Sequence, residues 1–146
     1  MKEVRTEIDI SASREKVWSI LTDFASHAGW NPFIKTWRGG TNEGDRLCIV
    51  LQPPGAKKAM SFCPTLLVFE ENTELRWKGK LLFRGLFDGE HIFELESMGE
   101  NSTKFIHREE FGGILVPFMG SVLKKTRQGF EAMNEALKTI AEFKTE

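Results

Sequence analysis

The sequence predicts an α+β fold in which a curved antiparallel sheet of about seven strands wraps around a long C-terminal helix. Two short helices are expected after the first strand. Three observations lead to this prediction. An alternating segment at the N-terminus runs directly into a helical segment, about six further alternating segments are separated by short turns, and one apolar stripe at helical spacing ends the chain.

The length of 146 residues suits one domain, and no repeat or linker divides residues 1–146. The 20 basic and 21 acidic residues nearly cancel. Nucleic-acid-binding proteins usually have a basic excess, so we expect no nucleic-acid partner. No apolar run approaches the ~20 residues of a transmembrane helix, and the N-terminus lacks the apolar core of a signal peptide. These features predict a cytoplasmic protein without a transmembrane segment.

The two cysteines, Cys48 and Cys63, flank the turn at residues 52–56. A disulfide is conceivable if their strands pair, but two free thiols are expected in a reducing cytoplasm. The Cys-x-x-Cys and Cys/His spacings of zinc sites are absent from the sequence. We therefore expect neither a metal nor a cofactor.

The N-terminal elements follow from periodicity and end signals. Apolar residues alternate over residues 4–10, which predicts a strand with one buried face. Serines precede apolar residues at helical spacing over residues 11–24, which predicts a capped helix. Residues 25–29 extend this as a second short helix, which Pro32 ends. Within the Trp-Asn-Pro-Phe run that follows, we expect Asn31 to stabilise the turn.

The predicted strands of the central region are separated by Gly-, Asn- or Pro-containing turns, which favours antiparallel hairpins. They cover residues 34–39, 46–52, 59–70, 74–79, 88–97 and 103–111.

The last predicted element is a helix of which one face is apolar. Its stripe, with spacings of four and three, is Met119, Leu123, Thr126, Phe130, Met133, Leu137 and Ile140. A coiled coil would also fit, but about three heptads are marginal for one, and the sheet has an apolar face to cover. Gly129 costs helix stability, so we expect a close approach to the sheet or a ligand there.

Polar residues share the predicted inner face of the sheet with aromatic residues. Alternation places His91 and Phe93 on one face of residues 88–97, and His107 and Glu109 on one face of residues 103–111. A turn at residues 97–101 would set His91 directly opposite His107, ~5 Å apart at Cβ. With Trp77 on the preceding strand, these side chains would converge on a mostly apolar surface.

Three interpretations of this polar cluster remain open at this stage. His91 and His107 could be core histidines that bond to the backbone or to Glu109. The cluster could instead orient a ligand within an apolar pocket. It could also perform acid–base catalysis, for which His107 and Glu109 are the candidate catalytic residues.

The remaining apolar features also have two interpretations each. The aromatic residues Trp30, Phe33 and Trp37 could be ordinary core residues or could line a cavity. The apolar loops at residues 80–87 and 112–120 could mark a partner, a membrane surface or a pocket entrance, or could fold into the core.

The order of these segments resembles the START-related, pollen-allergen-like helix-grip superfamily (SRPBCC), most of all its polyketide cyclase/dehydrase and lipid-transport-like branch. The segments that carry the resemblance are IDISASREKVWSILTDF, WNPF, LRWKG, GLFDGEHIFELE, HREEFGGILVP and the C-terminal helix. Together they cover nearly the whole chain in order.

The resemblance implies a deep cavity between sheet and helix that holds lipids, sterols, plant hormones, flavonoids or polyketides, with cyclisation or dehydration in some members. Two departures are the absence of a Rieske cysteine–histidine motif and the absence of tyrosine. They exclude the iron–sulfur oxygenase branch and any mechanism that needs a phenol side chain. Alternation and resemblance together give the expected ligand-binding residues: Trp30, Phe33, Trp37, Trp77, His91, Phe93, His107, Glu109, Phe111, Met119, Leu123 and Phe130.

Our first hypothesis is binding or transport of a small hydrophobic molecule. The second is a cyclase or dehydratase acting on a polyketide-like substrate. The third is a co-chaperone-like interaction module whose apolar loops also allow transient membrane contact. His107→Gln should weaken binding in a carrier and stop turnover in an enzyme, whereas serines at Leu82 and Phe83 should affect only an interaction module. The sequence does not indicate an oligomeric state.

Overall fold

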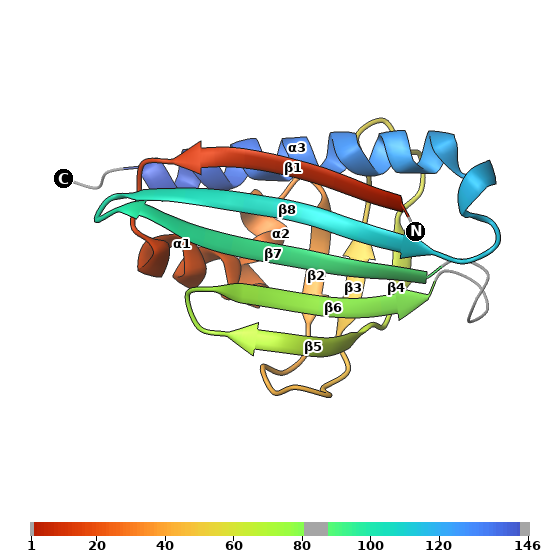
Figure 1. The fold of residues 1–146 in the computed structure, drawn as a ribbon, viewed down its shortest axis with the longest axis horizontal. Helices are drawn as coiled ribbons and strands as arrows, with labels where there is room; N and C mark the ends of the chain where they lie inside the picture. The colour runs from red at the N-terminus through yellow and green to blue at the C-terminus, as the bar shows by residue number, and fades with distance from the viewer. Residues whose placement is uncertain (1, 81–87, 144–146) are drawn as a thin grey trace.

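In the computed structural model of the protein, which describes residues 2–80 and 88–143, an antiparallel sheet system curves beneath one long helix (Figure 1). This arrangement confirms the predicted α+β helix-grip fold. The elements are β1 (Lys2–Ile10), α1 (Arg14–Leu21), η1 (Phe24–Ser26), α2 (His27–Trp30), β2 (Ile34–Arg38), β3 (Cys48–Leu51), β4 (Met60–Phe62), β5 (Thr65–Glu70), β6 (Glu74–Lys80), β7 (Asp88–Gly99), β8 (Ser102–Gly112), η2 (Val116–Phe118) and α3 (Gly120–Glu142).

The strands form two hydrogen-bonded groups, in the orders β1-β8-β7-β6-β5 and β2-β3-β4. The single strand expected over residues 59–70 is divided between them, because β4 pairs with β3 whereas β5 pairs with β6. The division falls at Cys63–Pro64, and proline has no N–H to donate to a ladder. A bridge between Arg46 and Thr65 connects the two groups.

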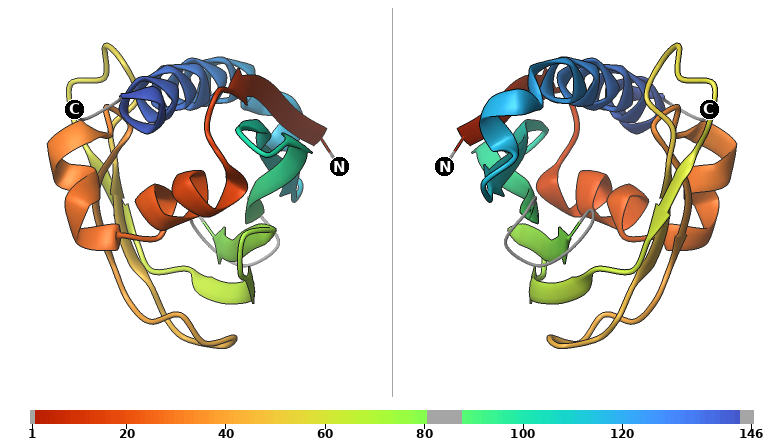
Figure 2. Two further views of the ribbon diagram at one scale, coloured as in Figure 1. Left: turned by 90° about the vertical axis from the view of Figure 1, so that its left-hand side faces the viewer. Right: turned by 90° about the vertical axis from the view of Figure 1, so that its right-hand side faces the viewer.

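Helix α3 covers the open side of the curved sheets, and the end-on views of Figure 2 show it above the two groups of strands. Its buried face includes Leu123, Phe130, Met133 and Leu137, as the predicted stripe requires. At the C-terminal end Ala141 is buried, whereas Ile140 is 36% exposed. The stripe therefore drifts by one residue, as expected when a 3.5-residue pattern is followed along a straight helix of 3.6 residues per turn.

Gly129 of α3 has the close approach that the sequence predicted. A Cβ atom on this residue would lie 2.4 Å from Cδ1 of Phe33, so the helix backbone packs directly on that ring. Phe33 is held in place by a turn that Asn31 stabilises, as predicted. The Oδ1 atom of Asn31 accepts hydrogen bonds from the backbone N–H groups of Phe33 and Ile34, both at 2.9 Å.

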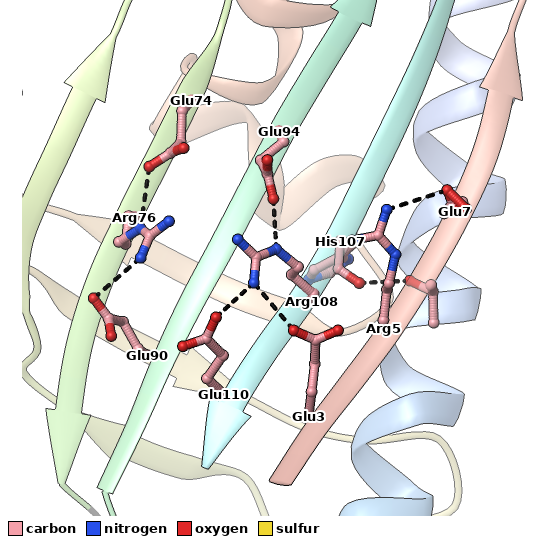
Figure 3. A network of polar contacts seen from close by, with 11 residues as sticks. Glu3, Arg5, Glu7, Glu74, Arg76, Glu90, Glu94, His107, Arg108 and Glu110 are labelled. Carbon is pink, nitrogen blue, oxygen red and sulfur yellow. Dashed lines mark hydrogen bonds and ion pairs between the residues drawn. The ribbon is translucent and has the colours of Figure 1, made fainter. Parts of the chain in front are cut away.

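The outer face of the five-stranded group carries a network of ion pairs (Figure 3). Arg108 contacts Glu3, Glu94 and Glu110, and Arg76 contacts the neighbouring glutamates of β6 and β7. Partly exposed pairs of this kind contribute little stability each. The network marks the outward face of these strands, and the alternate residues point inward.

Candidate functional site

A cavity of about 210 Å³ lies between the sheets and the N-terminal part of α3. Its walls come from both groups of strands and from the helix. The lining residues are Phe33, Leu51, Pro53, Ala56, Lys58, Met60, Phe62, Trp77, Gly79, Gly89, Glu109, Phe111, Val122, Lys125 and Thr126. We refer to this space as the sheet–helix pocket.

The lining of the sheet–helix pocket is mostly aromatic and aliphatic, with few polar side chains. Lys58 and Lys125 line the pocket but are exposed residues, and neither forms an ion pair with Glu109. Thr126 donates its hydroxyl hydrogen to the carbonyl oxygen of Val122 within the helix at 2.9 Å. Glu109 is therefore the polar group that stands out on the described wall, and 17% of its side chain is exposed.

Glu109 lies on β8 directly across from His91 on β7. The predicted pairing of His91 with His107 is wrong, because His107 lies opposite Phe93. The hairpin continues as far as Gly99 and Ser102, so its turn is tighter than the expected turn at residues 97–101. The resulting shift of two residues leaves every side chain on its predicted face.

The two histidine rings nevertheless meet on the diagonal, and a chain of short polar contacts continues from them into α3. The Nε2 atoms of His91 and His107 are 2.7 Å apart. His107 Nδ1 is 2.9 Å from Oδ1 of Asn134. Asn134 Nδ2 donates to Oγ1 of Thr6 at 2.8 Å, and that hydroxyl donates to the carbonyl oxygen of His107 at 2.8 Å. At the other end, Oε1 of Glu109 is 3.6 Å from Nδ1 of His91.

The direction of this chain follows from the number of hydrogens available. The single hydroxyl hydrogen of Thr6 goes to a carbonyl oxygen, so Oγ1 accepts from the amide nitrogen of Asn134. That fixes the amide orientation and leaves Oδ1 of Asn134 facing His107 Nδ1, which must donate. In a neutral His107, Nε2 is then the acceptor for N–H of His91, and Nδ1 of His91 presents a lone pair to Glu109.

Burial favours the neutral form of each of these groups. It lowers the pKa of His107 to about 3, against a smaller opposing effect of the hydrogen bond with Asn134. Burial first, and the neighbouring His107 second, lower the pKa of His91 well below its usual value. Burial raises the pKa of Glu109 to about 8. At neutral pH the cluster therefore consists of two neutral imidazoles and a protonated carboxyl group.

Gly89 makes room for the carboxyl group on the pocket wall. A Cβ atom on this residue would lie 2.4 Å from Oε2 of Glu109. Oε1 faces the histidines, whereas Oε2 lies over the bare backbone of β7 beside the cavity. The two oxygens of one carboxyl group therefore have different surroundings.

The predicted ligand-binding residues fall into three groups. Phe33, Trp77, Glu109 and Phe111 line the sheet–helix pocket. A second group is buried behind this wall and does not line it: Trp37, His91, Phe93, His107, Leu123 and Phe130. Trp30 and Met119 are partly buried against the core.

Neighbouring rings hold the buried histidines in place. The ring of His107 stacks on Phe130 with centroids 3.9 Å apart. The ring of His91 packs on Trp77 at 4.5 Å and on Phe93 at 4.6 Å. His107 could therefore influence a ligand only indirectly, through His91 and Glu109.

Sequence reasoning missed Asn134 and Thr6, which complete the polar chain. The helix and strand periods place both residues on a buried face. Asn134 lies four residues after Phe130 in α3, and Thr6 lies two residues after Val4 in β1. A polar side chain on an otherwise apolar face was the sequence signal that could have identified them. The β3–β4 part of the lining was also missed, because residues 59–70 were predicted as one strand rather than as β4 and β5 in separate groups.

The two apolar loops have different outcomes. Residues 81–87 of the first loop lie outside the described residues. In the second loop Val116 is buried, whereas Ile114 is 70% and Phe118 is 81% exposed. Part of this loop therefore packs into the core, whereas other apolar side chains of the loop are exposed on the surface.

Within residues 2–80 and 88–143, no group of three or more His, Cys, Asp or Glu side chains is placed to hold a metal ion. Cys48 and Cys63 are free thiols with their sulfur atoms 3.3 Å apart. No helix among the described residues is long and apolar enough to span a membrane.

The sequence model of a family described as "Polyketide cyclase / dehydrase and lipid transport" matches residues 1–142. No curated protein matches the sequence.

Solved structures with the same fold have low sequence identity to this chain. A START superfamily protein from Mycobacterium smegmatis is 21% identical with a TM-score of 0.76, over 96% of this chain and 97% of that one. The di-domain ARO/CYC BexL from the BE-7585A biosynthetic pathway is 11% identical with a TM-score of 0.75, over 99% of this chain and 51% of that one. Norcoclaurine synthase from Thalictrum flavum is 15% identical with a TM-score of 0.71, over 99% and 89%. At these identities the likeness concerns the fold alone.

Proposed function

Because the chain belongs to the polyketide cyclase/dehydrase and lipid transport family, we propose that it binds a small hydrophobic molecule in the sheet–helix pocket. The observation that carries this proposal is an apolar cavity of about 210 Å³ with one partly buried carboxyl group on its wall. Ligand pockets are typically apolar with a few convergent polar groups. We expect this function to be carried out in the cytoplasm.

The volume of the cavity restricts the size of the ligand. An apolar cavity of about 150 Å³ in another protein holds benzene. A cavity of about 210 Å³ therefore suits a molecule of one or two rings, or a short branched chain. Burial of its apolar surface would supply the affinity, at roughly 25 cal/mol per Å² before the costs of ordering.

One observation also favours a second function, acid–base catalysis on the bound molecule. Glu109 combines access to the pocket with a raised pKa and a lone pair of His91 facing it. Groups with perturbed pKa values in clefts are candidates for catalytic acids and bases. In this alternative Glu109 exchanges a proton with the ligand, and His107 acts on it through His91 as a positioning residue.

The proposal is tested by native mass spectrometry of gently purified protein, followed by extraction of whatever is bound. Val122→Trp should fill the cavity from α3, because Val122 lines it and is half-buried. Gln128→Trp is the matched control, since Gln128 is exposed on the same helix and does not line the pocket. An apolar molecule that is bound by the wild type and Gln128→Trp, and lost from Val122→Trp, would support the proposal. Equal occupancy in both variants would place the ligand elsewhere and contradict it.

A further inference from the structure

We propose that the bound molecule presents a hydroxyl group to Glu109, so that the sheet–helix pocket selects a one- or two-ring alcohol or phenol over its ether or its hydrocarbon frame. This inference rests on the proposed function and specifies the ligand. It follows from the direction of the hydrogen-bond chain behind the pocket wall and from the different surroundings of the two carboxyl oxygens.

The chain assigns an acceptor role to the oxygen of Glu109 that the ligand meets. Thr6 and Asn134 fix His107 as a donor at Nδ1, and His107 in turn fixes His91 as a donor at Nε2. The lone pair on Nδ1 of His91 faces Oε1 of Glu109 at 3.6 Å. This separation is too long for a hydrogen bond, but the lone pair is the acceptor nearest to Oε1 and favours a carboxyl hydrogen on Oε1 over one on Oε2 electrostatically. Oε2 is then a carbonyl-type acceptor.

The alternative position of the proton gives the same result. If it moves from Glu109 to Nδ1 of His91, both carboxylate oxygens become acceptors. A ligand that offers only acceptor atoms would leave Oε2 without a partner in either case. A hydroxyl group satisfies it in both.

No donor of the described lining forms a hydrogen bond or ion pair with Glu109, whose polar contact is with His91. This holds for the indole N–H of Trp77 as well as for the two lysines and Thr126. Lys58 and Lys125 are exposed residues, and the hydroxyl hydrogen of Thr126 is used within α3. Gly89 contributes no side chain to the space around Oε2. A bound ligand covers this partly exposed acceptor, and an acceptor that is buried without a partner costs free energy. A ligand donor should therefore be favoured by about tenfold in affinity.

The test compares 2-naphthol with 2-methoxynaphthalene and naphthalene at pH 7. These probes share one two-ring frame and differ in the donor. Dissociation constants are measured by calorimetry for the wild type, Glu109→Gln and Glu109→Met. Glutamine can donate its amide N–H to His91 and still present a carbonyl oxygen to the ligand, whereas methionine offers neither at similar volume.

We expect the wild type and Glu109→Gln to prefer 2-naphthol over 2-methoxynaphthalene by about tenfold more than Glu109→Met does. The ratio of the two dissociation constants is compared between proteins, so the difference in hydrophobicity between the probes cancels. Equal ratios in all three proteins would overturn the inference while leaving hydrophobic binding intact. Loss of the preference in Glu109→Gln would overturn the assigned direction of the chain. Failure of every probe to bind the wild type would instead contradict the proposed function, and the inference with it.

Discussion

The Nε2 atoms of His91 and His107 lie 2.7 Å apart inside the protein, so the two rings share one hydrogen and only one of them can donate across the contact. This contact connects the pocket wall at Glu109 to Asn134 of the long helix. The direction of the hydrogen-bond chain, and with it the predicted ligand preference, depends on this contact.

The pH dependence of stability should have a maximum near pH 6.5. The pKa values of His91 and His107 are lowered by folding, so between about pH 4.5 and 6.5 the unfolded chain binds more protons at these residues and stability rises with pH. The pKa of Glu109 is raised to about 8, so from about pH 4.5 to 8 the folded chain holds one more proton there and stability falls with pH. His27 adds to the histidine effect, because burial lowers its pKa as well. The histidines outweigh Glu109 below about pH 6.5, and as their effect fades above this pH that of Glu109 dominates.

Urea unfolding at a series of pH values between 5 and 8 checks this profile, with Glu109→Gln as the control. The decline of the wild type above pH 6.5 should approach about 1.4 kcal/mol per pH unit at most and should be absent from the variant. Parallel curves for the two proteins over this range would show that Glu109 is ionised in the folded state, against our account.

Asn134→Leu should destabilise the protein by about 1–3 kcal/mol, because it leaves the Nδ1–H of His107 buried without an acceptor. The free energy of unfolding in urea measures the effect. Gln128→Leu on the exposed side of the same helix should change it by less than about 0.5 kcal/mol. Equal effects of the two substitutions would mean that the polar chain contributes nothing specific.

Gly89→Ala should weaken ligand binding as well as stability. The new methyl group would lie 2.4 Å from Oε2 of Glu109 and must displace the carboxyl group into the pocket. We expect a destabilisation of about 1–3 kcal/mol, typical of overpacking. Gly112→Ala at the end of β8 is the control, since its Cβ would meet nothing within 4 Å. Unchanged affinity for 2-naphthol in Gly89→Ala would argue that the ligand does not reach Glu109.

Gly129→Ala tests the contact between α3 and Phe33. Alanine is favoured over glycine in a helix by about 1 kcal/mol, so an increase in stability would be expected from helix propensity alone. The Cβ atom would instead lie 2.4 Å from the ring of Phe33, and we expect a net loss of about 1–3 kcal/mol in urea unfolding. Gly120→Ala at the start of the helix, with open space around its Cβ, should not destabilise. A stabilised Gly129→Ala protein would refute the close approach.

Much of the fold could be predicted from periodicity because each element has one buried face. The helices, the inward face of β7 and β8, and the turn at Asn31 follow from local patterns. The register of β7 on β8 could not be predicted, since a shift of two residues preserves the pattern. The division of residues 59–70 into two strands was signalled only by Pro64. The alternation of apolar residues takes no account of a proline.

The candidate site was less predictable than the fold, because its parts are distant in the sequence. Thr6 and Asn134 are 128 positions apart, and neither carries a motif. The size of the cavity depends on how the β2-β3-β4 group curves toward α3 and on the bare backbone at Gly79 and Gly89. These are properties of packing between elements, which periodicity within one element does not contain.

The most direct test of hydrophobic binding in the sheet–helix pocket is an NMR titration of ¹⁵N-labelled protein with naphthalene. This probe has no polar group, so it tests the pocket separately from the role of Glu109. We predict saturable shift changes concentrated at the amides of Gly79, Gly89, Phe111 and Val122, which line the cavity. Absence of saturable changes, or changes concentrated on the outer face around Arg76 and Arg108, would contradict the proposed function.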